Sequence, residues 1–265
     1  MSEYDIVHIA IASPNIVEAS LIEKVAAIIN KDLYETRLLL AGKIPRTIAH
    51  YQTIQAAESV AQSLRALGIV AIAYNDSELR KPSLLNFRAH TMKLEGREVT
   101  FWNKGGEARR VKAENVFLIL KGKVQTYTEK ETTRTKMKFS LPATVLTGGI
   151  PIWRKVKETI REPSSQTEYF VRLYDRTSPE PTVEIFQYNI DYSFLGKKMA
   201  SSSLINLNTT VTELRNTFPQ AVFDDRLAKA FQVDVPSRMP VDETEVNCKL
   251  IYLYHQALSS LGPSV

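Results

Sequence analysis

The spacing of apolar residues changes near residue 80, and this change constrains the fold more than any other feature of the sequence. Before it, segments with an apolar residue at every third or fourth position alternate with short apolar runs, which is typical of helices between strands. After it, several short runs alternate apolar and polar residues with a period of two, as strands do. The sequence therefore predicts an α+β protein, with a small α/β part followed by a mostly β part.

The first part predicts the order strand, helix, helix, strand, helix, strand. Its second helix begins after Asp32, which forms a capping box with Glu35, and we expect Gly42 to end this helix in the left-handed conformation. Thr53 is the expected N-cap of the third helix, and Gly68 is expected to end it. These signals predict a compact βααβαβ domain.

The passage from the first helix to the last strand of this domain reads IEKVAAIINKDLYETRLLLAGKIPRTIAHYQTIQAAESVAQSLRALGIVAIAY. With its order of elements and Pro45 after a short second helix, it resembles the C-terminal domain of the bacterial ribosomal stalk protein and, by fold, the adaptor domain of the Clp protease. The resemblance covers residues 1–78. In the stalk family this domain docks translation factors through basic and apolar residues of its first two helices. The resemblance thus implies an interaction domain in which Arg37 matches a basic docking position; a stable domain without a ligand is the alternative.

The segment NDSELRKPS, Asn75 to Ser83, concentrates turn-forming and charged residues and predicts a linker. Residues 84–222 then show about seven strand-like runs, the last of them DYSFLG, followed by a helix with Asn208 or Thr209 as its cap. This order, and the passage VTFWNKGGEARRVKAENVFLILKG around Glu114, resemble bacterial pleckstrin homology-like domains. The resemblance implies an antiparallel scaffold that binds a protein or a ligand.

Residues 223–265 predict a C-terminal helical segment. FDDRLAKAF is typical of a short helix, and DETEVNCKLIYLYHQALSSLG of a longer one. We expect the longer helix to pack on one of the two domains through a stripe of apolar residues, namely Val246, Leu250, Leu253, Ala257 and Leu261.

A basic stretch interrupts the β part, with an insertion at residues 125–165. Between Lys121 and Arg161 there are ten Lys or Arg and three Glu, a net charge of +7 against +5 for the whole chain. Its first half has no helical periodicity and predicts a mobile hairpin or a disordered loop; its second half contains the apolar run LPATVLTGGIPIW. The residues expected to bind a partner, besides Arg37, are Lys136, Lys138, Ile150, Ile152, Trp153, Arg154, Lys155 and Lys157.

Three kinds of partner fit this stretch, and a solvated loop folded back on its own domain is the fourth alternative. A protein partner would use the apolar residues as an anchor and the cations for steering. An acidic membrane surface would attract the cations and take up the apolar tip. A nucleic acid would use the same cations against its phosphates, but few aromatic residues are available to stack on bases.

No catalytic or cofactor-binding motif accompanies these features. The sequence has no phosphate loop, dinucleotide fingerprint, zinc-protease motif or hydrolase elbow, and its single cysteine, Cys248, cannot form an internal disulfide. The four histidines fall in separate predicted elements and are expected to be structural. No signal peptide and no apolar run of about 20 residues is present, which predicts a cytoplasmic protein.

These observations predict a non-catalytic cytoplasmic interaction or adaptor protein that needs no cofactor or metal. It would bind a protein partner through the small α/β domain and the basic insertion. A peripheral membrane module or a nucleic-acid-binding module is one alternative. An enzyme that uses Asp224, Asp225 or His50 is the other.

Overall fold

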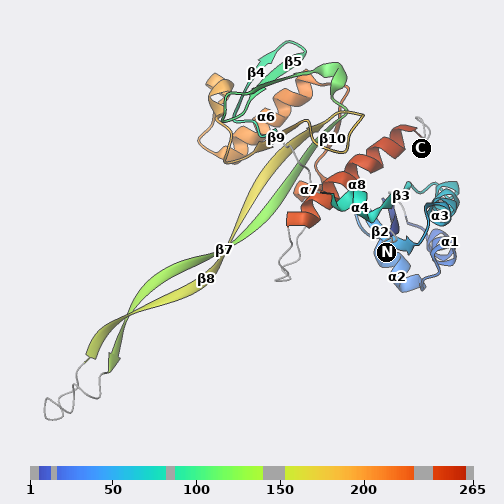
Figure 1. Cartoon of the computed structure of the whole chain (residues 1–265), viewed down its shortest axis with the longest axis horizontal. Coiled ribbons are helices and arrows are strands. Elements are labelled where there is room, and N and C mark those ends of the chain that lie inside the picture. The colour runs from blue at the N-terminus through green and yellow to red at the C-terminus, as the bar shows by residue number, and fades with distance from the viewer. Residues whose placement is uncertain (1–5, 13–16, 82–86, 140–152, 230–240, 261–265) are drawn as a thin grey trace, which may run out of the picture. The chain divides into compact units, whose positions relative to one another are not determined.

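The computed structural model describes most of the chain (Figure 1), namely residues 6–12, 17–81, 87–139, 153–229 and 241–260. The chain divides into two compact units. The larger unit contains Met1–Val124 and Glu168–Val265, and the smaller unit contains Gln125–Thr167. The fold is α+β, as predicted.

The first part of the larger unit has the predicted order of elements and forms a three-stranded sheet. The strand order is β2-β1-β3, and β1 pairs antiparallel with both neighbours. Helices α1 and α3 lie on one face of this sheet, where apolar side chains of all these elements form one core. The elements are β1 (Val7–Ile11), α1 (Ala19–Ile29), α2 (Leu33–Leu40), β2 (Arg46–Tyr51), α3 (Ile54–Ala66) and β3 (Ala71–Asn75).

The predicted helix boundaries in this part are confirmed where a side chain or a glycine sets them. Asp32 accepts a hydrogen bond from the backbone N–H of Glu35 at 2.8 Å, and Thr53 accepts one from Ala56 at 3.3 Å. Each bond satisfies a backbone donor that has no partner within the helix. Gly68 follows α3 with φ of +79°, the left-handed conformation that glycine adopts without strain.

Two expectations for this part are wrong. Gly42 is not in the left-handed region; instead a Cβ at this position would lie 2.5 Å from Nε of Arg46, so the glycine leaves room for that side chain. The predicted linker Asn75–Ser83 contains a short helix, α4 (Asp76–Arg80), whose Leu79 is buried. A buried apolar residue in a charged segment anchors it, and the charge of the neighbours concealed this.

The β part of the larger unit has two sheets. One has the order β4-β5-β6, and the other has the order β10-β7-β8-β9. Apolar residues from both sheets pack with one face of helix α6 in a shared core. The elements are β4 (Thr91–Glu95), β5 (Glu98–Trp102), β6 (Ala108–Lys112), β7 (Leu118–Phe139), β8 (Trp153–Tyr174), β9 (Val183–Phe186), α6 (Ser203–Thr217), β10 (Val222–Asp224) and α7 (Arg226–Lys229).

Three local expectations for the β part are corrected. The run DYSFLG is a 3₁₀ helix, Tyr192–Lys198, because the side chain of Asp191 accepts the backbone N–H of Ser193 and so caps a helical turn. Helix α6 begins at Ser203, before the predicted caps Asn208 and Thr209, which lie inside it. Strand β10 was not predicted, and it pairs parallel with β7.

Strands β7 and β8 are neighbours of 22 residues each and extend into the smaller unit. Within the described residues 125–139 and 153–167 the basic insertion is therefore a hairpin, one of the two predicted alternatives. The apolar run between the strands lies outside the described residues.

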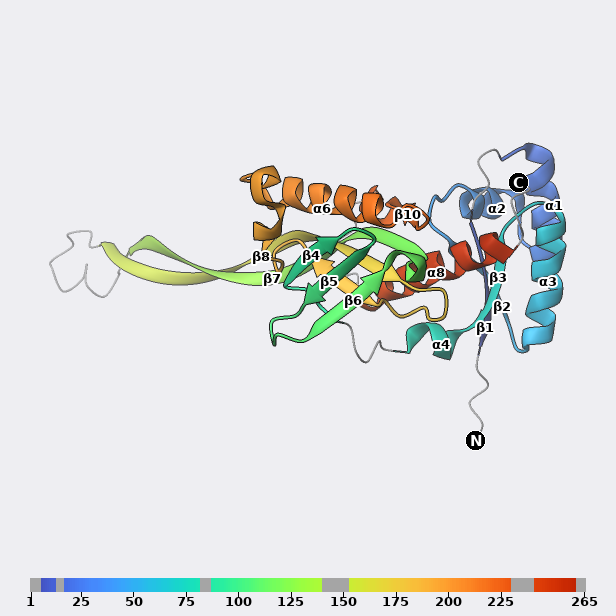
Figure 2. The same ribbon diagram turned by 90° about the horizontal axis from the view of Figure 1, so that it is seen from above.

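Helix α8 (Val241–Ser260) lies on the face of the β1–β3 sheet opposite α1 and α3 (Figure 2). Val246, Leu250 and Ala257 pack there with residues of β1, β3 and α4. Cys248 and Ile251 pack on another side with β7, β8 and α7. The helix therefore contacts both parts of the larger unit, whereas one apolar stripe predicted contact with a single domain.

Candidate functional site

Helix α2 exposes an apolar surface around a cation. Leu33, Tyr34 and Leu38 are 54%, 74% and 51% exposed, and Arg37 is exposed among them. The pairs 33/37 and 34/38 are each four residues apart, so the members of each pair are neighbours on the helix surface. The helix is attached to the rest of the fold through Leu40, which is fully buried. We call these four exposed residues the α2 surface.

The charge of Arg37 is not neutralised by its neighbours. Within the part of the chain that the structure describes, Arg37 forms no ion pair. The nearby acid Glu35 is paired with Lys31 along the helix, and Asp32 caps the helix N-terminus. The α2 surface therefore combines three exposed apolar side chains with an available positive charge, an arrangement suited to an acidic and apolar partner.

The other predicted partner-binding residues belong to the smaller unit. Lys136 and Lys138 are in β7, and Trp153, Arg154, Lys155 and Lys157 are in β8. Lys155 is exposed. Ile150 and Ile152 lie outside the described residues. Because β7 pairs with β8, the described members of this set belong to one hairpin. Arg37 belongs to the larger unit.

The chain matches no family model, no curated protein and no solved structure. Its function must therefore be inferred from its own residues.

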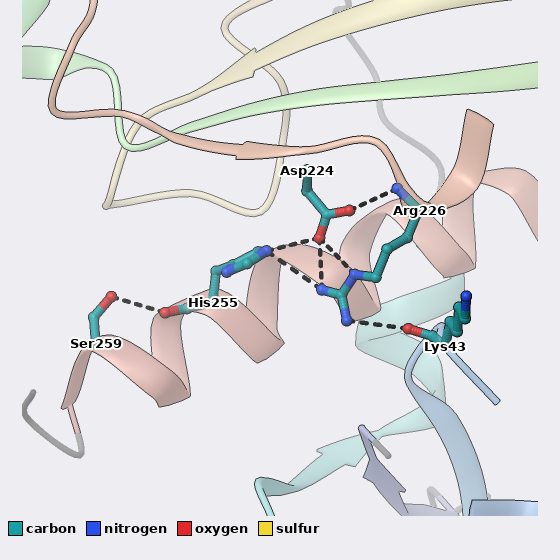
Figure 3. A network of polar contacts seen from close by, with 5 residues as sticks. All are labelled: Lys43, Asp224, Arg226, His255 and Ser259. Atoms are coloured by element: carbon teal, nitrogen blue, oxygen red, sulfur yellow. Dashed lines mark hydrogen bonds and ion pairs between the residues drawn. The ribbon is translucent and has the colours of Figure 1, made fainter. Parts of the chain in front are cut away.

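Asp224 and His255, two residues of the kind used in catalysis, meet in a polar network (Figure 3). Nε2 of His255 lies 2.8 Å from Oδ2 of Asp224, and both residues are at least nine-tenths buried. Arg226 donates to the same carboxylate through its backbone N–H and its guanidinium, and to the carbonyl of Lys43 at 3.1 Å. The network links β10 and α7 to α8 and to the loop before β2.

The pKa of Asp224 shows that this network stabilises the ionised carboxylate. Burial alone would raise the pKa, but hydrogen bonds from His255 and Arg226 outweigh burial and hold it well below its usual range. Nε2 of His255 and the carboxylate of Asp224 are directed at one another, and both side chains are buried within the fold. Asp225, the neighbouring candidate, pairs with Lys229 at 2.9 Å. The arrangement is that of a structural clamp.

A second buried network joins β8 and β9 to α8. The guanidinium of Arg172 contacts the carboxylate of Glu184 at 2.7 Å and also pairs with Glu245 of α8. Arg172 and Glu184 are 3% and 0% exposed. Cys248 lies beside them, and burial raises the pKa of its thiol to about 12, so it remains protonated and unreactive. Arg88 also contacts Glu184, at 3.5 Å, so two cations face the two carboxylates of this network.

Two cavities involve residues considered above. One, of about 410 Å³, is lined by Glu114 and Asn115 together with Arg110 and Arg176. The lining carries charges of both signs, so the cavity favours neither a cationic nor an anionic ligand. The other, of about 660 Å³, is lined partly by His50 at the β2 edge of the first sheet.

The high Leu and Tyr content of α2 is a sequence signal for the α2 surface. Five of the eight residues of α2, LYETRLLL, are Leu or Tyr. A helix this short, with leucines around much of its circumference, cannot bury all of them against one neighbour. Which of these residues are exposed, namely Leu33, Tyr34 and Leu38, becomes clear only from the orientation of the helix in the fold.

None of the helices in the described part of the chain has the length and apolar character that a membrane span requires.

Proposed function

We propose that the protein is a non-catalytic, cytoplasmic interaction protein that binds an acidic segment of a protein partner through the α2 surface. The observation that carries this proposal is the exposure of Leu33, Tyr34 and Leu38 around Arg37, which has no ion-pair partner within the described ranges of the chain. Aromatic residues and arginine are enriched at protein interfaces, and clusters of them supply most of the binding energy. The occupant is an amphipathic segment with apolar residues and at least one carboxylate facing Arg37.

The composition of the α2 surface favours a protein over a nucleic acid. A nucleic acid requires many cations along its phosphates, and affinity that depends steeply on salt. The α2 surface offers three apolar side chains for one cation, a ratio that suits an apolar anchor with a single ion pair. The exposed apolar residues therefore determine affinity, and Arg37 determines the orientation of the partner.

The hairpin of the smaller unit supplies long-range attraction for the same acidic partner. From Thr132 to Lys157 the sequence holds six Lys or Arg and no Asp or Glu. Such a one-signed segment raises the association rate with an acidic protein, and screening by salt removes the effect.

The proposal is tested by binding of one partner to three versions of the protein. A partner captured at physiological salt is identified, purified and titrated against wild type, a Tyr34→Ser/Leu38→Ser variant, and a version with residues 125–163 replaced by a short Gly-Ser linker. We expect the α2 variant to weaken the affinity at least tenfold, and the linker version mainly to lower the association rate.

The control is Ser63→Ala on the exposed side of α3, which should bind as wild type does. Equal affinity of wild type and the α2 variant would contradict the proposal. Sedimentation with acidic vesicles, or binding to RNA, that is lost in the linker version and not in the α2 variant would assign the protein to the membrane or nucleic-acid class instead.

A further inference from the structure

Two histidines face each other across the first sheet. His8 of β1 is the direct partner of His50 of β2 in the antiparallel register. Their Nδ1 atoms are 2.6 Å apart, and their rings are nearly perpendicular. His8 is 9% exposed, and His50 is exposed. One imidazole is thus fixed by the fold, and the other can reach solvent.

The second nitrogen of His8 is fixed by a carboxylate. Nε2 of His8 lies 3.0 Å from Oδ1 of Asp76, at the start of α4, and Arg80 donates to both oxygens of Asp76. With its Nε2–H directed at Asp76, His8 accepts the 2.6 Å hydrogen bond from Nδ1–H of His50. An ion that binds both Nδ1 atoms replaces this hydrogen bond, and His50 then carries its proton on Nε2.

This is the arrangement in which a carboxylate orients a metal-ligating histidine through its other ring nitrogen. We propose that His8 and His50 form a two-imidazole binding site for a divalent first-row transition-metal ion, of which Cu²⁺, Ni²⁺ and Zn²⁺ are the preferred class. Neutral imidazole is a favoured ligand of these ions, and affinity at such sites rises from Ni²⁺ to Cu²⁺. Asp76 is the positioning residue and does not contact the ion.

The site needs only a small movement to accept an ion. Two nitrogens at about 2.0 Å from a tetrahedral zinc are about 3.3 Å apart, so the Nδ1 atoms must separate by less than 1 Å. His50 is exposed and is one of the residues that line the cavity of about 660 Å³. Among the residues that the structure describes, no group of three or more His, Cys, Asp or Glu could hold a metal, so water completes the coordination and the ion exchanges readily.

The metal site and the α2 surface consist of different residues. His8, His50 and Asp76 are outside the α2 surface, so variants of either set leave the other intact. Stacking of His8 on Tyr74, with ring centroids 5.4 Å apart, holds the buried ring in place. The Tyr74 hydroxyl bonds Thr47 at 2.6 Å and does not compete for the ion.

The test is titration of tag-free protein with NiCl₂ and CuSO₄ at pH 7.5, followed by calorimetry. We expect binding at one site, with affinity reduced at least tenfold in His50→Gln. Asp76→Asn should weaken binding by about 10-fold or more, as loss of a carboxylate that orients a ligand does. Copper bound to wild type should show nitrogen hyperfine coupling in its electron paramagnetic resonance spectrum, and this should be weaker in His50→Gln.

His90→Gln is the matched control, because His90 bonds the carbonyl of Asn189 in the β part and should not affect the site. Circular dichroism checks that each variant is folded. No heat of binding by wild type up to about 1 mM metal would overturn the inference. So would unchanged affinity in His50→Gln, or a loss in His90→Gln as large as that in His50→Gln.

Discussion

The environment of charged residues differs between the buried networks that contact helix α8 and the exposed surface of helix α2. At α8, Arg172, Glu184 and Asp224 are almost completely buried, and each is paired with an opposite charge. On α2, Arg37 is exposed beside apolar residues and has no ion-pair partner among the described residues. A buried charge that loses its partner is costly, so the α8 charges serve the fold. An exposed unpaired charge costs little in the free protein and is available to a partner.

The same difference separates residues whose type suggests a function from residues whose exposure suggests one. Asp224 and His255 resemble a catalytic pair in identity, yet their contacts are directed at one another and at Arg226 within the fold. Leu33, Tyr34 and Leu38 have no chemical reactivity, yet they are among the large apolar side chains that the fold leaves exposed. Exposure and pairing, rather than residue type, are the criteria on which the α2 surface is proposed as the binding surface.

The largest expected effect is that of Arg172→Ala. This change removes the buried cation of Glu184 and leaves only the longer ion pair with Arg88 at 3.5 Å, which should lower the free energy of unfolding by about 3–5 kcal/mol. Urea denaturation measures it. The control is Lys198→Ala, which removes a surface ion pair with Glu213 and should cost about 0–1 kcal/mol. Equal losses in the two variants would show that the buried network is not structural.

Asp224→Asn should come next, with a loss of about 1.5–3 kcal/mol, because hydrogen bonds to a charged carboxylate are replaced by weaker ones. The pKa of Asp224 is lowered in the folded state, so its contribution is complete above the unfolded pKa of about 3.9 and is lost as pH falls through the folded value. The difference between wild type and variant should therefore shrink below about pH 4.

Urea denaturation between pH 7 and pH 3 checks this prediction, with Asp225→Asn as the adjacent control. Asp225 pairs with the exposed Lys229, and its loss should cost less than about 1 kcal/mol. A stability difference for Asp224→Asn that grows on acidification would contradict the assignment of Asp224 as an ionised clamp.

Gly122→Ala should have an intermediate effect. A Cβ at this position would lie 2.3 Å from the ring of Phe170, which is itself buried. Overpacking of this kind typically costs about 1–3 kcal/mol. Thermal unfolding measures the change, and a variant as stable as wild type would show that Phe170 can move aside. The result indicates how rigid the packing around Phe170 is.

The smallest expected change in stability is that of Tyr34→Ser. Tyr34 is 74% exposed, so its replacement should alter the free energy of unfolding by no more than about 0.5 kcal/mol. The same denaturation experiment applies. A loss above about 2 kcal/mol would mean that Tyr34 is buried in solution and is not part of a free surface.

Local signals explain which elements the sequence predicts. Asp32 and Thr53 cap helices through bonds that span three residues, so the sequence contains both partners in each case. Strand β10 has three residues and is held by pairing with β7, more than a hundred positions away, and no local pattern reveals it. The fold class and the first βααβαβ order were therefore predictable, whereas β10, α4 and the 3₁₀ helix at Tyr192–Lys198 depended on distant or unrecognised contacts.

The candidate sites were less predictable because they depend on register and orientation. Arg37 was singled out by resemblance, but its apolar neighbours Leu33 and Leu38 became evident only once the buried side of α2 was known. The meeting of His8 with His50 requires the exact pairing of β1 with β2, and a shift of one residue would separate the two rings. Composition identified the basic hairpin, because a charge excess needs no geometry.

The most direct measurement is the affinity of the purified partner for wild type and for Arg37→Glu, together with a partner in which the facing carboxylate is changed to lysine. If the α2 surface is the docking site, Arg37→Glu should weaken binding of the normal partner at least tenfold. The lysine-bearing partner should restore much of that loss with Arg37→Glu and bind wild type poorly. Equal affinity of wild type and Arg37→Glu for the normal partner would contradict docking through α2.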